Sequence, residues 1–275
     1  MQTVMAGAMR LPRLGLGTWR LRGRECTEAV LSALELGYRH IDTAEAYGNE
    51  EAVGEALAGT SVPRREFVVT TKVWWDHLTP DAMRRALEGS LGRLHTPYVD
   101  LYLIHWPAPD MNLAAALHQM MAFREQGLVR HIGVANFPMT LLRQAVEEIG
   151  APIVCNQVEC HVNLGQSRVL GYLRSKGMAL VAYRPLGGGR LADAAALRGI
   201  ADAHGATPAQ VALAWLLHQD GVAAIPKAAG RARQQANLAA ADLALDAEDL
   251  AALAALPKGD RHVSPGWAPA WDPPG

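Results

Sequence analysis

Short runs of β-forming residues alternate with longer stretches of helical periodicity along almost the whole chain. In the stretches between the runs, such as residues 25–37, apolar side chains recur every three or four positions, as in an amphipathic helix. Strands that alternate with helices pair in parallel, because each return needs a crossover. The pattern predicts an α/β fold, a closed (β/α)8 TIM barrel, with an open doubly wound sheet as the alternative. The eight runs lie at residues 14–19, 39–42, 67–73, 99–105, 131–136, 153–159, 179–185 and 222–228.

Two further helical segments extend this pattern. We expect one extra helix at 191–204, after the seventh strand, and another at 246–256, near the C-terminus. The helix ends carry matching signals, because Thr79 and Thr207 each precede a proline and glycines such as Gly37 follow predicted helices.

The length and composition fit one large domain. The chain has 275 residues, of which 50% are hydrophobic and 19% charged, and a barrel of this length is a single domain with a large core. No Ser/Gly-rich linker divides the sequence. We therefore expect residues 1–275 to form a single domain that ends in an irregular Pro/Gly-rich tail at 257–275.

The charge balance excludes several classes of partner. A net charge of −1 leaves no basic field to hold nucleic acid or an anionic membrane. The first ten residues lack the features of a secretory signal, and no segment approaches the roughly 18–20 apolar residues of a membrane span. Three cysteines, Cys26, Cys155 and Cys160, fit a reducing compartment and are predicted to be buried thiols. We expect a cytoplasmic protein with a small-molecule partner.

Polar residues follow three neighbouring predicted strands at their carboxyl ends, where barrels bind substrates. Asp42 ends the second run, Tyr47 lies on the loop after it, and Lys72 and His105 end the third and fourth runs. Taken singly, each has an ordinary structural interpretation, such as a helix cap, a surface lysine or a core histidine. Together they gather an acid, a phenol, an ammonium and an imidazole at one rim, which favours a catalytic group.

These four side chains can form a general acid. A phenol has a pKa of about 10, which a neighbouring ammonium lowers, and a carboxylate fixes the position of that ammonium. An imidazole nearby can orient and polarise a carbonyl oxygen. Because none of the four is a strong nucleophile, the electron pair must come from elsewhere, and a bound hydride donor is the natural source.

Several motifs spread over most of the chain resemble those of the aldo-keto reductase superfamily: GLGTWR, HIDTAEAYGNE, TTKVWW, LYLIHWP, NQVE and IPKA. The resemblance implies that Asp42, Tyr47, Lys72 and His105 form the catalytic tetrad of that family, with Tyr47 as the proton donor. It also implies that NADPH, or NADP+ after reaction, lies extended across the barrel mouth without a Rossmann fold, and that the protein is a monomer with a small-molecule carbonyl substrate.

The resemblance also assigns contacts to the cofactor. Asn136 and Gln157 would hydrogen-bond the nicotinamide carboxamide, and Tyr183 would stack on the ring. Lys227 and Arg233 match the site of the adenosine 2′-phosphate, where paired charges favour NADPH over NADH. The other cofactor-binding residues that it implies are Asn237 at the adenine and Arg184, Leu186 and Gly187 nearer the pyrophosphate.

Four positions depart from the pattern of the family. Ala135, Arg184 and Ala228 stand where serine or threonine is usual, and Ala236 replaces a glutamate that contacts adenine. These changes leave the four catalytic residues intact, so the reaction is unaffected, and they leave open the cofactor affinity and the strength of the preference for NADPH. One hypothesis is that Arg184 compensates by reaching the pyrophosphate.

Aromatic residues are expected to wall the substrate pocket. Three tryptophans beside one barrel rim favour a pocket, and the resemblance implies that role for them. The C-terminal tail, which carries Trp267 and Trp271, folds over the mouth in relatives. The residues expected to contact substrate are Trp19, Tyr47, Trp74, His105 and Trp106.

Within the superfamily, the segments 206–217 and 245–272 are most similar to bacterial 2,5-diketo-D-gluconate reductases, some of which also reduce methylglyoxal. The expected reaction is therefore NADPH-dependent reduction of small aldehydes, 2-oxoaldehydes or keto-sugar acids to alcohols. The run GGGRLA at 187–192 also fits a dinucleotide fingerprint, but the acidic residue that a Rossmann unit needs would be Asp202, inside a predicted helix.

Other classes of function remain as alternatives. A glycosidase would pair Asp42 with Glu45 or Glu159, although Lys72 beside Asp42 favours charge neutralisation. A metal-dependent hydrolase would use Asp42, His105 and His161, which lack a recognised metal-binding spacing, so we expect no metal in the site. A non-enzymatic alternative is a cofactor-binding regulatory subunit on the same fold.

Overall fold

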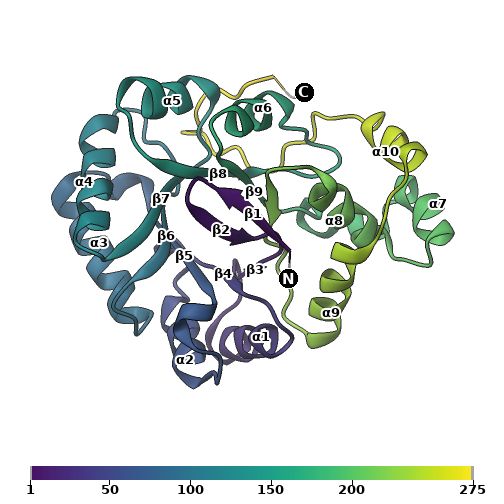
Figure 1. Ribbon diagram of the computed structural model, residues 1–275, viewed down its shortest axis with the longest axis horizontal. Helices are drawn as coiled ribbons and strands as arrows, with labels where there is room; N and C mark the ends of the chain where they lie inside the picture. Colours follow the sequence, from purple (N-terminus) through teal and green to yellow (C-terminus); the bar gives the residue numbers. More distant parts are fainter. Residues whose placement is uncertain (1, 274–275) are drawn as a thin grey trace.

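The computed structural model describes residues 2–273, and its central feature is a ring of parallel strands surrounded by helices (Figure 1). The strands follow one another around the ring in the order of the sequence, and each overlaps one of the expected runs, so all eight are confirmed. They are β3 (Leu16–Gly17), β4 (His40–Asp42), β5 (Val68–Val73), β6 (Val99–Ile104), β7 (Val129–Ala135), β8 (Ile153–Glu159), β9 (Ala179–Tyr183) and β10 (Val222–Ala224).

Backbone hydrogen bonds close the ring between its first and last strands. Leu14 and Ala224 form a parallel bridge, and the N–H of Gly15 donates to the carbonyl of Ala224 at 2.9 Å. The N–H of Gly17 donates to the carbonyl of Pro226 at 3.2 Å. The expected TIM barrel is therefore confirmed over the open doubly wound sheet.

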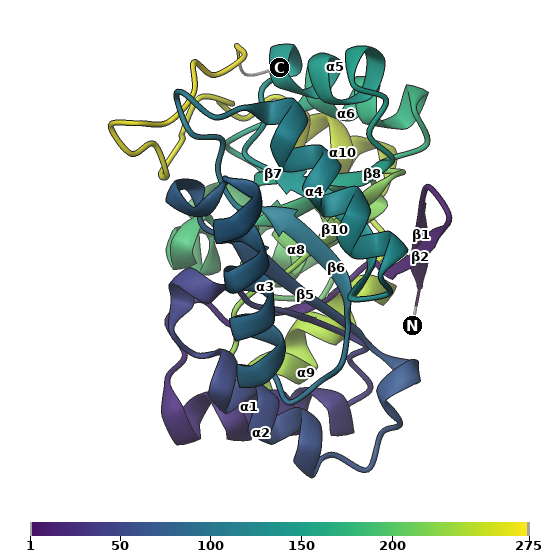
Figure 2. The same cartoon turned by 90° about the vertical axis from the view of Figure 1, so that its left-hand side faces the viewer.

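Helices form an outer layer around the barrel and bury the strands on their outer face (Figures 1 and 2), so that a strand such as β6 is buried along its whole length. The α-helices of this layer are α1 (Gly23–Glu35), α2 (Glu50–Gly59), α3 (Pro80–Arg93), α4 (Leu113–Glu125), α5 (Met139–Arg143), α6 (Ser167–Ser175), α8 (Pro208–His218) and α9 (Arg231–Ala239). A π-helical turn, η4 (Gln144–Glu148), continues α5, and short 3-10 helices are η1 (Glu45–Tyr47), η2 (Arg64–Glu66), η3 (Trp75–His77), η5 (Gly187–Asp193) and η6 (Ala240–Asp242).

The two extra helices are present where the sequence predicts them, as α7 (Ala195–Ala203) and α10 (Ala247–Ala254). Both threonine–proline signals mark helix starts. Thr207 forms a capping box with Gln210, whereas the Thr79 side chain makes no capping hydrogen bond. The proline at the first helical position therefore marks the start of α3 without a side-chain cap.

An N-terminal hairpin that the sequence analysis did not predict covers one opening of the barrel. Its strands, β1 (Thr3–Ala6) and β2 (Met9–Pro12), turn at Gly7, which has a positive φ of 58°. Figure 2 shows the hairpin on the side opposite the C-terminal tail. Its inward side chains belong to the core cluster inside the barrel: Val4, Ala6, Met9 and Leu11 with Leu101, Leu103, Ala135, Val154, Cys155, Ala179, Val181, Ala223 and Ile225.

The C-terminal tail is irregular, as the Pro/Gly-rich composition predicts. Between residue 257 and residue 273 its regular pairing is one isolated bridge, from Gly259 to Leu164. In the part of the chain that the structure describes, no helix has the length and apolar character needed to cross a membrane.

Candidate active site

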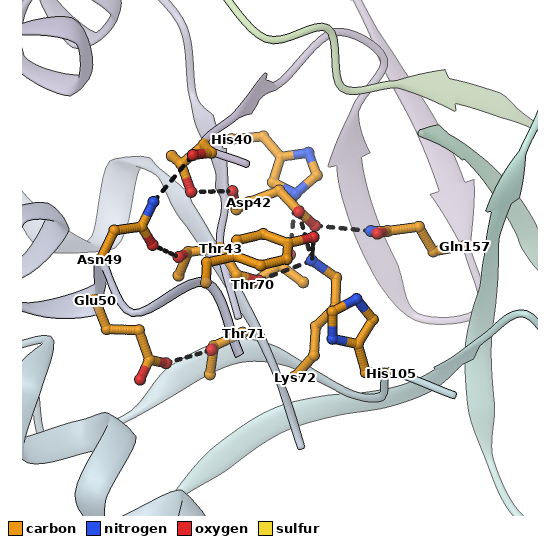
Figure 3. A network of polar contacts seen from close by, with 12 residues as sticks. His40, Asp42, Thr43, Asn49, Glu50, Thr70, Thr71, Lys72, His105 and Gln157 are labelled. Carbon is orange, nitrogen blue, oxygen red and sulfur yellow. Dashed lines mark hydrogen bonds and ion pairs between the residues drawn. The ribbon is translucent and has the colours of Figure 1, made fainter. Parts of the chain in front are cut away.

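The carboxyl ends of β4, β5 and β6 bring the four predicted catalytic residues together, and Figure 3 shows Asp42, Lys72 and His105 of this group. Asp42 is the last residue of β4, and Tyr47 ends the short helix η1 just after it. Lys72 lies near the end of β5, and His105 directly follows β6. Because neighbouring parallel strands end at one face, residues separated by 63 positions in sequence meet there.

A buried ion pair is the centre of the group. The Lys72 Nζ lies 2.5 Å from Asp42 Oδ1 and also donates to the carbonyl of Thr43 at 2.7 Å and to the Tyr47 hydroxyl at 3.3 Å. The other carboxylate oxygen of Asp42 accepts a hydrogen bond from Gln157 Nε2 at 2.7 Å. Lys72 and Asp42 are 0% and 1% exposed, so water does not screen the pair.

The pKa of Tyr47 differs from the expectation. Burial raises it well above 10, and the negative charge of Asp42 raises it further. The prediction that the ammonium of Lys72 lowers this pKa is therefore wrong. The main reason is burial, which favours the neutral phenol, and Asp42 at 2.5 Å also pairs with the ammonium, which lies farther from the phenol. Tyr47 consequently keeps its proton at neutral pH, the form that a proton donor requires.

His105 faces the same group as a neutral imidazole. Burial lowers its pKa well below 6.5, and the positive charge of Lys72 adds to the effect. Its ring centroid lies 5.5 Å from that of Tyr47 in an edge-on arrangement. The Nδ1 atom is buried and has no hydrogen-bond partner among the described residues, while the backbone carbonyl of His105 accepts a bond from Asn136 Nδ2 at 2.9 Å.

Residues that the sequence analysis missed hold the loop that carries Tyr47. The Thr43 hydroxyl donates to Asn49 Oδ1 at 2.8 Å (Figure 3). Asn49 Nδ2 donates to the carbonyls of Thr18 and Leu21. Thr43 and Asn49 both lie in the motif HIDTAEAYGNE, so membership of that motif could have identified them as part of the site. Buried polar side chains that are fully paired fix a single loop conformation.

Glu50, the next residue, anchors the neighbouring strand. Its carboxylate accepts from the Thr71 hydroxyl at 2.5 Å and from Arg93 Nη2 at 2.6 Å. Thr71 precedes Lys72 in β5, so this bond helps to fix the strand from which the lysine projects. Glu50 is 1% exposed, and its pairing with Arg93 compensates the buried charge.

A cleft of about 1740 Å³ opens over these residues. Its size exceeds that of a typical pocket for one small ligand, about 300–1,000 Å³. Of the predicted cofactor and substrate residues, Gly187 does not line it. Those that do are Trp19, Tyr47, Trp74, His105, Trp106, Asn136, Gln157, Tyr183, Arg184, Leu186, Lys227, Arg233 and Asn237, and the predicted catalytic Asp42 lines it as well. Lining residues that the sequence analysis did not predict include Glu45, His77, Thr207, His262 and Ser264.

The amides predicted to bind the nicotinamide are already partly engaged. Asn136, which has a positive φ of 62°, accepts a hydrogen bond from the Tyr183 hydroxyl at 2.8 Å through Oδ1. Its Nδ2 donates to His105, and Gln157 Nε2 donates to Asp42. Each NH₂ group carries two hydrogens, so each amide retains one donor for a ligand.

Two cations line the far end of the cleft. Lys227 and Arg233 are exposed, and neither forms an ion pair with another residue in the range 2–273. Arg231, in contrast, pairs with Glu35 at 3.0 Å on the surface and does not line the cleft. Of the two alanine substitutions nearby, Ala228 is buried and Ala236 lines the cleft.

A glycine-rich turn forms one wall of the cleft. Gly187, Gly188 and Gly189 all have positive φ, and a Cβ on Gly188 would lie 2.6 Å from Arg184 Nη2. The guanidinium of Arg184 therefore packs directly over the turn. Asp202 lies inside α7, so the context of a Rossmann fingerprint is absent, as predicted.

Aromatic side chains from the tail close over the mouth. The Trp267 ring stacks on Trp75 at 4.9 Å between centroids and meets the edges of Trp74 and Trp106 at 5.8 and 5.3 Å. Trp271 contacts Trp106 at 5.8 Å but does not line the cleft. The tail therefore adds one wall to the predicted substrate pocket.

The residues weighed for a metal-dependent hydrolase do not form one group. Asp42 is bound by Lys72 and Gln157, whereas His161 lies in a cluster with Glu159 and His262. Among residues 2–273, this cluster is the one set of three His, Cys, Asp or Glu side chains whose ligand atoms all lie within 4.8 Å of one another.

Comparison with known proteins agrees with this geometry. A sequence model of one protein family, described as the Aldo/keto reductase family, matches residues 13–258 of this chain. Methylglyoxal reductase DkgB of Salmonella typhi is 42% identical over 268 residues, which cover 96% of this chain and 100% of that protein. An aldo-keto reductase of Mycolicibacterium smegmatis is 40% identical over 252 residues, 91% of each chain.

A solved structure is also similar to this chain in fold and in sequence. The crystal structure of a candidate 2,5-diketo-D-gluconic acid reductase B has a TM-score of 0.96 and 41% sequence identity, and the match covers 99% of this chain and 98% of that one. The chain therefore belongs to the aldo/keto reductase family, whose members are oxidoreductases that reduce carbonyl groups.

Proposed function

We propose that this protein reduces small 2-oxoaldehydes and keto-sugar acids to alcohols with NADPH, and that Tyr47 donates the proton. The observation that carries the proposal is the contact of the Tyr47 hydroxyl, 3.3 Å from Lys72 Nζ, beside His105 in the wall of the cleft. The names of its relatives, a methylglyoxal reductase and a candidate 2,5-diketo-D-gluconic acid reductase, support this substrate class. We further propose that residues 1–275 act as one domain, as a cytoplasmic monomer.

The residues of the cleft fit a phosphorylated dinucleotide. Lys227 and Arg233 supply positive charge at one end that no ion pair within residues 2–273 neutralises, which suits a 2′-phosphate. Gly188 and Gly189 offer backbone without side chains along the wall, and Asn136 and Gln157 offer amides at the catalytic end. When bound there, the reduced nicotinamide supplies a hydride to the carbonyl carbon and leaves as NADP+.

Each side chain of the catalytic group has a separate role in the proton transfer. Tyr47 gives its proton to the carbonyl oxygen as negative charge develops there, and Lys72 stabilises the phenolate that remains. Asp42 holds the ammonium in place at 2.5 Å. The neutral imidazole of His105 orients the carbonyl oxygen toward Tyr47, and the tryptophans of the mouth exclude water.

The test compares the wild type with Tyr47→Phe. We expect methylglyoxal or 2,5-diketo-gluconate to cause loss of nicotinamide absorbance from NADPH with the wild type. The variant, which lacks only the hydroxyl, should turn over about 100- to 10,000-fold more slowly. Cofactor affinity, measured by fluorescence titration, should change little in the variant. Normal turnover by Tyr47→Phe would overturn the proposed role of this residue.

The same assay separates the alternatives. A glycosidase or a metal-dependent hydrolase would consume no NADPH with any of these substrates. A regulatory subunit would bind NADPH in the titration but oxidise little of it. Comparison of several aldehydes and keto-sugar acids by kcat/KM then identifies the preferred substrate class.

A further inference from the structure

A second cluster of polar side chains lies where the C-terminal tail meets the barrel. Glu159 ends β8, His161 follows two residues later, and His262 belongs to the tail. The Glu159 Oε1 lies 3.6 Å from His161 Nε2 and 3.7 Å from His262 Nδ1, and the two imidazole rings have centroids 5.1 Å apart. None of the three belongs to the catalytic group described above.

The imidazole of His161 makes no hydrogen bond within residues 2–273. The side chain is 1% exposed, Nδ1 has no partner there, and Nε2 has only the carboxylate oxygen of Glu159 at 3.6 Å, beyond hydrogen-bond distance. A buried polar atom without a hydrogen bond is unfavourable by about 1–3 kcal/mol, so these two nitrogens call for an explanation. A ligand that accepts electron pairs from imidazole nitrogen would satisfy at least one of them.

His262 is oriented as a metal ligand usually is. Its Nε2 pairs with Asp260 Oδ2 at 2.9 Å, which leaves Nδ1 facing Glu159. Imidazoles that bind metals commonly donate their other nitrogen to a carboxylate, which fixes both the tautomer and the ring orientation. Asp260 provides that second carboxylate here.

The carboxylate of Glu159 is also held in place before any ligand binds. It accepts backbone N–H bonds from His262, at 3.1 Å to each oxygen, and from Val263 at 2.9 Å. Each carboxylate oxygen has two lone-pair directions, so these bonds leave Oε1 able to coordinate a cation.

We propose that Glu159, His161 and His262 bind one Zn²⁺ or chemically similar divalent transition-metal ion, which ties the tail to the barrel. Two imidazoles and one carboxylate are an established Zn²⁺ ligand set, and a fourth position remains for water. Tetrahedral bonds of about 2.0–2.2 Å place ligand atoms roughly 3.3–3.6 Å apart, close to the 3.6 and 3.7 Å from Glu159 Oε1 to the two imidazoles, and all three ligand atoms lie within 4.8 Å of one another. Arg261, whose charge interacts with Glu159, opposes binding, and Asp260 offsets it.

Such an ion would couple the tail to the cofactor wall of the cleft. A Cβ on Gly187 would lie 3.4 Å from His262 Cε1, so the imidazole packs against the start of the glycine turn. Glu159 is paired in register with Tyr183, the last residue of β9. Binding of the ion is therefore expected to hold the tail tryptophans over the mouth and to slow exchange of ligands.

The test is calorimetric titration of the metal-free full-length protein with ZnCl₂, with His262→Ala and Asp260→Asn as variants. We expect saturable binding of one Zn²⁺ per chain by the wild type. His262→Ala should abolish it, and Asp260→Asn should weaken it by about 10- to 100-fold. His118→Ala, which removes an exposed histidine of α4, is the matched control and should bind as the wild type does.

Limited proteolysis with trypsin provides a second measurement that depends neither on binding heats nor on enzyme activity. Zn²⁺ should slow tryptic cleavage after Arg261 in the wild type and in His118→Ala, but not in His262→Ala. Equal Zn²⁺ affinity of His262→Ala and the wild type would overturn the proposal, as would the absence of saturable binding to the wild type. Circular dichroism of each variant verifies that the barrel remains folded.

Discussion

The two ends of the cleft differ in the burial and the pairing of their charged side chains. At the catalytic end, Lys72 and Asp42 are buried and satisfied by protein partners before any ligand arrives. At the far end, Lys227 and Arg233 are exposed and have no ion-pair partner in the described chain. The difference indicates that the reacting groups need a fixed geometry, whereas the charges at the far end are left for a ligand to neutralise.

The largest effect is expected from Lys72→Met, which leaves the buried carboxylate of Asp42 without its cation. Removal of one partner of a buried ion pair typically lowers stability by about 3–5 kcal/mol, and reductase turnover should fall by about 100-fold or more because the phenolate loses its stabilising charge. Urea unfolding and steady-state kinetics measure the two effects.

The double variant Lys72→Met/Asp42→Asn separates stability from catalysis. Without a buried charge to compensate, it should regain most of the lost stability while turnover stays low. Recovery of both quantities, or of neither, would contradict the view that this pair is a prebuilt part of the catalytic machinery.

A second prediction concerns His40, a buried neighbour of the catalytic pair. Its Nε2 bonds Thr70 Oγ1 at 2.9 Å, and burial lowers its pKa to about 4. Between about pH 6.5 and 4 the unfolded chain binds this proton and the native state does not, so stability falls as the pH falls. At about 1.4 kcal/mol per pH unit, the loss is at most roughly 3.5 kcal/mol.

Unfolding free energies over this pH range check the prediction. His40→Gln should flatten the dependence, although buried His105 still contributes a slope in the same direction. His118→Ala at an exposed position should leave the slope as in the wild type. An unchanged slope in His40→Gln would show that burial of this imidazole is not its origin.

A third prediction tests the cations at the exposed end of the cleft by comparing Arg233→Ala with the control variant Arg231→Ala. Arg233 lines the cleft, whereas Arg231 pairs with Glu35 on the surface. A charged hydrogen bond contributes about 1.5–3 kcal/mol, so Arg233→Ala should raise the KM for NADPH by about 10- to 100-fold and leave that for NADH almost unchanged. Arg231→Ala should change neither. Equal effects on the two cofactors would refute a 2′-phosphate contact.

The smallest effect is expected from Arg184→Ala. Its guanidinium lies over the glycine turn, and within the described chain no carboxylate pairs with it. If it reaches the pyrophosphate, its loss should weaken NADPH and NADH equally, by about tenfold. An unchanged dissociation constant for both cofactors would exclude this compensating role.

Most of the barrel and of the catalytic end could be predicted from the sequence, because both depend on local patterns. Alternating strand and helix signals fix the order of elements, and polar residues at strand ends converge wherever those strands pair. The pKa of Tyr47 could not be predicted, because it depends on burial and on how closely Asp42 approaches Lys72.

The contacts that the sequence did not reveal join distant segments or follow weak local signals. The hairpin at residues 3–12 is too short for its alternation to stand out, and its packing against the barrel core involves no motif. The contact of Glu159 with His262 spans 103 positions. Such pairings depend on how the tail folds back, which no local spacing encodes.

The hairpin and the tail lie on opposite sides of the barrel (Figure 2), and this placement bears on how the protein is produced for study. An affinity tag fused ahead of the hairpin emerges away from the cleft. A polyhistidine tag fused after the tail, in contrast, is attached to the segment whose Trp267 and Trp271 pack against Trp106 at the mouth. Kinetic and metal-titration samples should therefore carry a cleavable tag at the N-terminus.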